Sequence, residues 1–136
     1  MKSMTVMAQV KELERVLAFL RQELAPYECS AKTMFQLELV VEELFVNIAS
    51  YAYTESGGEV EVGCEVSGET PGITIRFADR GRPFDPLARA DAETTPEALE
   101  NRVGGLGILL VKKTMDEVAY AYEDGANVLT VKKYLP

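Results

Sequence analysis

Apolar residues recur at helical spacing in two stretches near the start of the chain. In the first stretch the positions are Val10, Leu13, Leu17, Leu20 and Leu24. This helix is expected to end at Pro26, because proline lacks the amide that a helix interior needs. A second helix is expected to begin after Ser30, a good capping residue, and to run to about Tyr53. It is the longest predicted element.

Strict alternation of apolar and polar residues predicts strands in the rest of the chain. Four segments show it, and residues 4–8 (MTVMA) form a short first candidate; the four are 59–66 (EVEVGCEV), 73–77 (ITIRF), 117–123 (EVAYAYE) and 127–134 (NVLTVKKY). Alternation implies that one face of the sheet is buried, so the helices should all lie on that face. The expected fold class is therefore α+β, a two-layer α/β sandwich with a mixed, mostly antiparallel sheet.

The two strand pairs are separated by about 30 residues rich in glycine, proline and charge, from Asp79 to Gly107. A compact domain seldom keeps so long an irregular stretch unless it has a function. The chain of 136 residues is expected to form a single domain, residues 1–136.

The charge and the absence of histidine narrow the chemistry. With 14 Lys and Arg against 22 Asp and Glu, the net charge of −8 disfavours binding to nucleic acid or to an anionic membrane. No histidine is present, which excludes Ser-His-Asp and Cys-His nucleophile pairs and histidine metal sites. Cys29 and Cys64 match no metal-binding spacing, and no signal-peptide pattern opens the chain, so a cytoplasmic protein with reduced thiols is expected.

The long helix carries a polar stripe. At about 100° per residue, Glu43, Asn47, Gln36 and Ser50 share one narrow sector of an otherwise apolar helix. Such a stripe is expected to face a cleft, because unpaired buried polar groups are costly. The alternative is that Glu43 and Asn47 are exposed between two packed neighbours or bond to a loop. A carboxylate and a carboxamide one turn apart suit a Mg²⁺-nucleotide site.

Two loops offer complementary groups. Asp79, at a strand end, can accept a hydrogen bond from an exocyclic amine, and Gly81 lets the backbone approach a flat ring. Gly104, Gly105 and Gly107 precede an apolar helical stretch, whose free amide groups attract phosphate. Taken singly, the first loop also fits an ordinary turn and the second a flexible entry into a core helix.

Basic residues flank the second loop. Arg102 lies just before the glycines and can reach a terminal phosphate or remain a solvated loop residue, whereas Lys112 and Lys113 are expected at the surface. The glycine spacing matches neither a Rossmann fingerprint nor a Walker loop.

Together, EELFVN (42–47), DRGRPFDP (79–86) and GGLGILLVKKTMD (104–116) resemble the anti-sigma-factor serine/threonine kinases of the GHKL, or histidine-kinase-like, ATPase superfamily with its Bergerat ATP-binding fold. The resemblance covers nearly the whole chain and rests on three motifs in the family's order. It implies that residues 1–136 are one such ATPase domain, with a mobile ATP lid at about residues 87–103.

The resemblance also implies roles for individual residues. Glu43 is similar to the general base, and Asn47 to the asparagine that binds Mg²⁺ at the triphosphate. Asp79 is similar to the adenine-binding aspartate, with Gly81 as its companion. The remaining nucleotide-binding positions that the resemblance implies are Arg102, Gly104, Gly105, Leu106 and Gly107.

For function, the resemblance implies that ATP and Mg²⁺ are used to phosphorylate a serine on an anti-anti-sigma partner of STAS type, which regulates a sigma factor. Family members commonly form homodimers, and no direct contact with nucleic acid or membrane is implied. The alternative is a nucleotide-gated binding module that sequesters a partner without phosphotransfer. A plain interaction domain without a ligand is a third hypothesis.

Three positions depart from the family pattern. Tyr51 stands where relatives often have histidine, and Pro83 stands at the second glycine of the D-x-G-x-G motif. Arg102 only approximates the basic residue expected before the glycines. These departures bear on the partner and the transfer step more than on ATP binding.

Overall fold

The computed structural model describes residues 1–53, 57–68, 71–87 and 106–135. Helices and strands follow one another as β1 (Lys2–Met7), η1 (Val10–Glu12), α1 (Leu13–Leu24), η2 (Ala25–Tyr27), α2 (Ala31–Tyr51), β2 (Glu59–Ser67), β3 (Gly72–Asp79), α5 (Leu106–Thr114), β4 (Glu117–Glu123) and β5 (Ala126–Tyr134). In the described part of the chain, no helix is long and apolar enough to cross a membrane.

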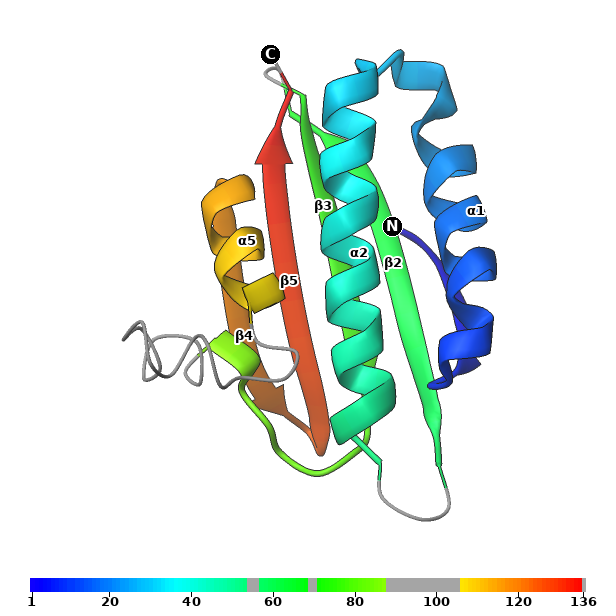
Figure 1. Ribbon diagram of the computed structural model, residues 1–136, viewed down its shortest axis with the longest axis vertical. Coiled ribbons are helices and arrows are strands. Elements are labelled where there is room, and N and C mark those ends of the chain that lie inside the picture. Colours follow the sequence, from blue (N-terminus) through cyan, green and yellow to red (C-terminus); the bar gives the residue numbers. More distant parts are fainter. Residues whose placement is uncertain (54–56, 69–70, 88–105, 136) are drawn as a thin grey trace.

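The described strands form one five-stranded sheet in the order β1-β2-β3-β5-β4. Helices α1, α2 and α5 all cover the same face, and α2 lies in front of the central strands (Figure 1). The predicted two-layer sandwich is therefore confirmed. All four strand pairings are antiparallel, so the sheet is uniform where a mixed one was expected. The chain returns from α5 through the edge strand β4, which leaves β5 beside β3.

The predicted patterns correspond to buried faces. Helix α2 begins as expected, since the Ser30 hydroxyl accepts a hydrogen bond from the Thr33 amide at 3.1 Å. The core between α2 and the sheet contains Leu37, Val40, Val41, Leu44, Phe45, Ile48, Val60, Val62, Cys64, Ile73, Ile75 and Phe77. Each element contributes the apolar positions of its own period, 3.6 residues in the helix and two in the strands.

The first helix differs slightly from its prediction. Val10 lies in the short 3-10 turn η1 and is exposed, and α1 ends at Leu24, just before the 3-10 turn that contains Pro26. Both cysteines are free thiols, as expected. Burial raises the pKa of the Cys64 thiol to about 12, which keeps it protonated at neutral pH.

The end of α2 is fixed to the end of β3. The Ala52 carbonyl accepts a hydrogen bond from the Arg82 amide at 2.9 Å. Gly81 lies so close to this carbonyl that a Cβ at position 81 would come within 2.0 Å of the Ala52 oxygen. The Tyr53 hydroxyl adds a second link, because it donates to the Glu59 carbonyl at 2.6 Å and accepts from the Arg80 amide at 2.9 Å. Glycine at 81 is thus required by helix packing.

We expect Gly81→Ala to destabilise the fold by about 1–3 kcal/mol, because the added methyl group meets backbone that cannot rotate away. Urea unfolding followed by circular dichroism measures this loss. Gly63→Ala is the matched control, since its new methyl group would meet the flexible end of the Met1 side chain. Equal stability of Gly81→Ala and the wild type would contradict the packing requirement.

Candidate functional site

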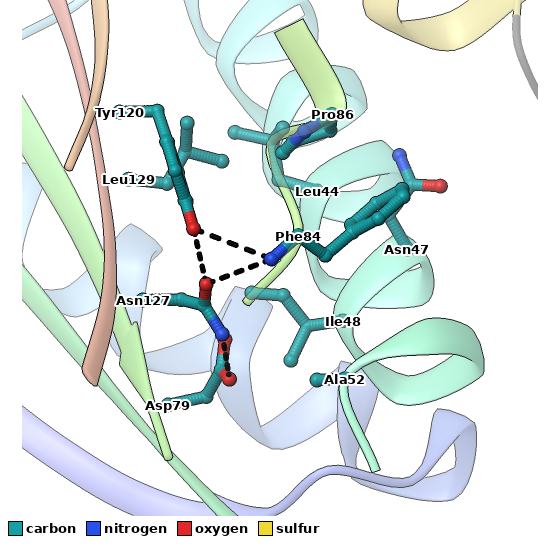
Figure 2. A pocket seen from close by; sticks show the side chains of 10 residues that line it. All are labelled: Leu44, Asn47, Ile48, Ala52, Asp79, Phe84, Pro86, Tyr120, Asn127 and Leu129. Carbon is teal, nitrogen blue, oxygen red and sulfur yellow. Dashed lines mark hydrogen bonds between the residues drawn. The ribbon is translucent and has the colours of Figure 1, made fainter. Parts of the chain in front are cut away.

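A cavity lies between α2 and the ends of the central strands, beside the turn that follows β3. Its wall combines apolar side chains with a few polar ones, and the lining residues are Leu44, Asn47, Ile48, Ala52, Asp79, Phe84, Pro86, Tyr120, Asn127 and Leu129 (Figure 2). An apolar pocket with a few fixed polar groups is the usual form of a small-molecule site. Its volume of about 20 Å³ holds roughly one water molecule.

Two buried polar side chains, Asp79 and Asn127, form the polar end of this cavity. Each is only 5% exposed, and they lie directly opposite each other on β3 and β5. The Asn127 amide donates to Asp79 Oδ1 at 2.9 Å, and the Gly81 amide donates to the same oxygen at 2.9 Å. One carboxylate oxygen therefore carries two internal hydrogen bonds, which fixes the orientation of the group.

Asn47 contributes the polar group of α2. Its Nδ2 is buried and has no hydrogen-bond partner among the residues that the structure describes. A buried unpaired amide costs about 1–3 kcal/mol, so such a group is uncommon without a functional reason. Asn47 also lines the cavity (Figure 2), so the unpaired amide belongs to the same site.

Glu43 lies one turn before Asn47 and borders the start of α5. A Cβ at Gly107 would come within 1.8 Å of Glu43 Oε2, so the carboxylate lies directly against this glycine. Burial, and secondarily the neighbouring Glu42, raises the pKa of Glu43. A carboxylate with a raised pKa accepts protons more readily at neutral pH. The absence of a side chain at Gly107 leaves room for the Glu43 carboxylate.

The outer wall of the cavity is the segment from Arg82 to Pro86. The Phe84 amide donates to Asn127 Oδ1 at 3.1 Å and to the Tyr120 hydroxyl at 3.3 Å. The Phe84 ring packs against Tyr51, with 5.6 Å between ring centroids. The Arg82 guanidinium donates to the Tyr51 carbonyl at 2.9 Å. Tyr51 thus supports this wall.

The structure brings some of the predicted site residues together. Asn47 and Asp79 line one cavity, Gly81 bonds to Asp79, and Glu43 contacts Gly107 at the start of α5. Leu106 is the first residue of α5. The predictions for Arg102, Gly104, Gly105 and all of the lid beyond Leu87 lie outside the described residues.

Two sequence expectations change. Lys113 is exposed, but the ammonium group of Lys112 is partly buried and donates to the Leu87 carbonyl at 3.1 Å. Ser50 shares the helical sector of Asn47 yet is exposed and does not line the cavity. The polar stripe therefore faces the site at Glu43 and Asn47 but not along its whole length.

Sequence reasoning gave no site role to Asn127, Tyr120 or Phe84, although all three line the cavity. A signal existed for Asn127, because alternation places it on the same face as the buried Leu129 and Val131. A polar residue on a buried strand face needs partners. Tyr120 lies on the half-buried face of β4 with Val118. Phe84 lies within the DRGRPFDP motif, but the motif does not show that its side chain lines the cavity.

Comparison with known proteins identifies the family. The histidine kinase-like ATPase domain matches residues 6–133. The chain belongs to this family. It is 31% identical over 112 residues to the serine-protein kinase RsbW of Oceanobacillus iheyensis, covering 78% of this chain and 68% of that protein. It is 29% identical over 108 residues to RsbW of Listeria innocua, with coverage of 76% and 68%. Within the histidine kinase-like ATPases, it therefore lies in the serine-protein kinase branch.

Solved structures share the histidine kinase-like ATPase fold. The RsbU and RsbW domains of Rv1364c from Mycobacterium tuberculosis align with a TM-score of 0.64 at 15% identity, over 99% of this chain and 33% of that one. SiaB in the SiaB-SiaC complex from Pseudomonas aeruginosa aligns with a TM-score of 0.58 at 18% identity, over 97% and 89%. At these identities the likeness supports the fold alone.

The raised pKa of Glu43 predicts how its replacement changes stability with pH. Folding favours the protonated carboxyl group, so stability falls as pH rises from the ordinary pKa of 4.5 through the raised folded value. Glu43→Gln, which cannot ionise, should therefore melt above the wild type at neutral pH. We expect this advantage to shrink as the pH falls towards 4.5.

Differential scanning calorimetry across this pH range measures the effect. Glu42→Gln, which removes an exposed charge from the next position, controls for the general effect of lower negative charge. If the difference in melting temperature between Glu43→Gln and the wild type stays constant across this pH range, burial of the charged carboxylate is not the cause of that difference.

Proposed function

We propose that this chain is an ATP-dependent kinase that phosphorylates a serine on an anti-anti-sigma partner of STAS type and thereby regulates a sigma factor. The observation that carries the proposal is a cavity lined both by Asp79, whose carboxylate is fixed by Asn127, and by Asn47, whose buried Nδ2 has no partner among the described residues. Family membership and the serine-protein kinase relatives support it. In this proposal residues 1–136 act as one cytoplasmic domain.

Asp79 binds the base. Its Oδ1 already accepts two internal hydrogen bonds, which leaves Oδ2 to accept one from the exocyclic amine of adenine. Leu44, Ile48 and Leu129 provide apolar surface for the faces of the ring. Gly81 serves this site indirectly, because it lets the Asp79 turn pack against the end of α2.

Asn47 and α5 hold the phosphate end of the nucleotide. The described residues include no cluster of three or more acidic, cysteine or histidine side chains able to hold a metal ion. Asn47 would supply the protein oxygen for a Mg²⁺ ion that is otherwise bound by the nucleotide phosphates. When bound, Mg²⁺ neutralises charge on the phosphates. Rotation of the Asn47 amide would break no hydrogen bond from Nδ2 to the part of the chain that the structure describes.

The first amide groups of α5 supply further positive potential for the phosphates. Gly107 lies in this first turn, directly beside the Glu43 carboxylate. The phosphate-binding and proton-accepting groups are therefore neighbours. Arg102, Gly104 and Gly105 remain proposed phosphate ligands on the strength of the family motif.

Glu43 acts as the general base in this proposal. It takes the proton from the partner's serine hydroxyl as the oxygen attacks the γ-phosphate, and ADP leaves. Its raised pKa suits this role, because a base works best with a pKa near the working pH. The relatives named serine-protein kinases support a serine as the acceptor.

Asp79→Asn tests nucleotide binding. The asparagine can keep the bonds from Gly81 and Asn127 by its oxygen, but it then presents an NH₂ group to the base, donor against donor. We expect Mg²⁺-ATP at about 100 times its dissociation constant to raise the wild-type melting temperature by several degrees, and this shift to vanish in Asp79→Asn. Asp124→Asn, at an exposed turn, should keep it. No shift in the wild type with millimolar ATP or ADP would refute the proposal.

Glu43→Gln tests the transfer step. We expect it to keep the ATP-induced thermal shift and to lower transfer of labelled γ-phosphate to a STAS-type partner by about 100-fold or more, as for loss of a general base. Glu42→Gln, at the neighbouring exposed position, should transfer at the wild-type rate. If the wild type binds nucleotide and partner but leaves the label in ATP, the chain is a nucleotide-gated binding module.

A further inference from the structure

Asn127 joins five groups from three parts of the chain. Its Nδ2 donates to Asp79 Oδ1 at 2.9 Å, to the Arg82 carbonyl at 2.8 Å and to the Gly81 carbonyl at 3.4 Å. Its Oδ1 accepts from the Phe84 amide at 3.1 Å and from the Tyr120 hydroxyl. The buried amide is therefore surrounded by acceptors on one side and donors on the other (Figure 2).

This pattern allows only one orientation of the Asn127 amide. A rotation by half a turn would place its oxygen against the Asp79 carboxylate and two carbonyl oxygens, and its NH₂ group against the Phe84 amide. Four of the five contacts would become unfavourable in a buried site, because only the Tyr120 hydroxyl can accept as well as donate. Asn127 is thus a fixed donor towards Asp79.

The fixed donor determines what Asp79 can offer to a ligand. Asp79 Oδ1 is occupied by Asn127 and by the Gly81 amide, and no donor among the described residues bonds to Oδ2. The carboxylate therefore presents one acceptor to the cavity that it lines. An acceptor held in this way attracts an amino group and repels a carbonyl oxygen.

Tyr120 keeps this arrangement when the outer wall moves. A cavity of about 20 Å³ is too small for a purine, so the Phe84 segment has to shift when a base enters. Its amide then no longer supports Asn127 Oδ1. The Tyr120 hydroxyl, on β4, is the second donor to that oxygen and does not depend on the position of Phe84.

We propose that Asn127 and Tyr120 are positioning residues that set the base preference of the site. They hold Asp79 so that a base with an exocyclic amino group at the position facing Oδ2 is preferred over one with an oxo group. The inference rests on the proposed function, because it concerns the base of the same nucleotide. It adds two residues, neither of which carries a role in the nucleotide motifs of the sequence.

The experiment compares ATP with ITP, whose base carries an oxo group in place of the amino group. Calorimetric titration gives the dissociation constant of each nucleotide with Mg²⁺ for the wild type and the variants. We expect the wild type to prefer ATP by about 10-fold or more, as for one hydrogen bond to a charged group. Tyr120→Phe should reduce this preference by about 2- to 10-fold, mainly through weaker ATP binding.

Asn127→Asp is the stronger variant, because it replaces the donor by a carboxylate of the same shape facing Asp79. We expect it to abolish most of the preference, and circular dichroism checks that it folds. Tyr122→Phe is the matched control, because Tyr122 lies on the same strand and face as Tyr120 but is 48% exposed. This variant should prefer ATP over ITP as strongly as the wild type does.

The preference ratio separates positioning from a merely structural role. A structural defect weakens ATP and ITP binding alike, so a parallel loss of both in Tyr120→Phe and Asn127→Asp would overturn the inference. Equal affinity of the wild type for ATP and ITP would also overturn it while leaving the proposed function intact. Binding of neither nucleotide by the wild type would refute the proposed function itself.

Discussion

The geometry of the site depends on the buried hydrogen bond between Asp79 and Asn127. Two polar side chains that are almost fully buried on neighbouring strands must find partners, or each costs about 1–3 kcal/mol. Asn127 satisfies this requirement because its amide also donates to the Gly81 and Arg82 carbonyls, in the turn that follows β3. The turn therefore cannot vary freely, and its position determines where the Phe84 wall lies. A polar constraint inside the core thus shapes an otherwise apolar cavity.

Helix α2 supplies the other side of the site, and it is held at both ends. Ser30 caps its start, and the Ala52 carbonyl is bound by the turn after β3. Between these points its packing against the sheet leaves Glu43 and Asn47 on the side that faces α5 and the cavity. Gly81 and Gly107 have the same structural role, because each lacks a side chain at a point of close approach. Each glycine lets a neighbouring element approach a group of α2, a carbonyl in one case and a carboxylate in the other.

Local pattern was sufficient to predict most of the fold and to select Asn47 and Asp79, which both line the cavity. Periodicity located α2, the strands and the sector shared by Glu43 and Asn47, because these features depend on neighbours within a few residues. The partners of Asn127 were not predictable in this way. They depend on the position of β5 between β3 and β4, which local pattern does not show. Lys112 was expected at the surface for the same reason, because its partner, the Leu87 carbonyl, is distant in sequence. Gly81 was singled out for close approach to a flat ring, whereas the contact that the structure shows, with Ala52, depends on tertiary packing.

The contact between Phe84 and Tyr51 has a consequence for rates of binding. These rings, together with the Phe84 amide bonds to β4 and β5, stabilise a closed wall in front of the cavity. A nucleotide that binds only the open form has its apparent affinity reduced by the fraction of molecules that are open. Its association then slows as well, because opening precedes encounter. In the proposed kinase, the Tyr51–Phe84 contact would therefore influence how fast a nucleotide enters and leaves the site.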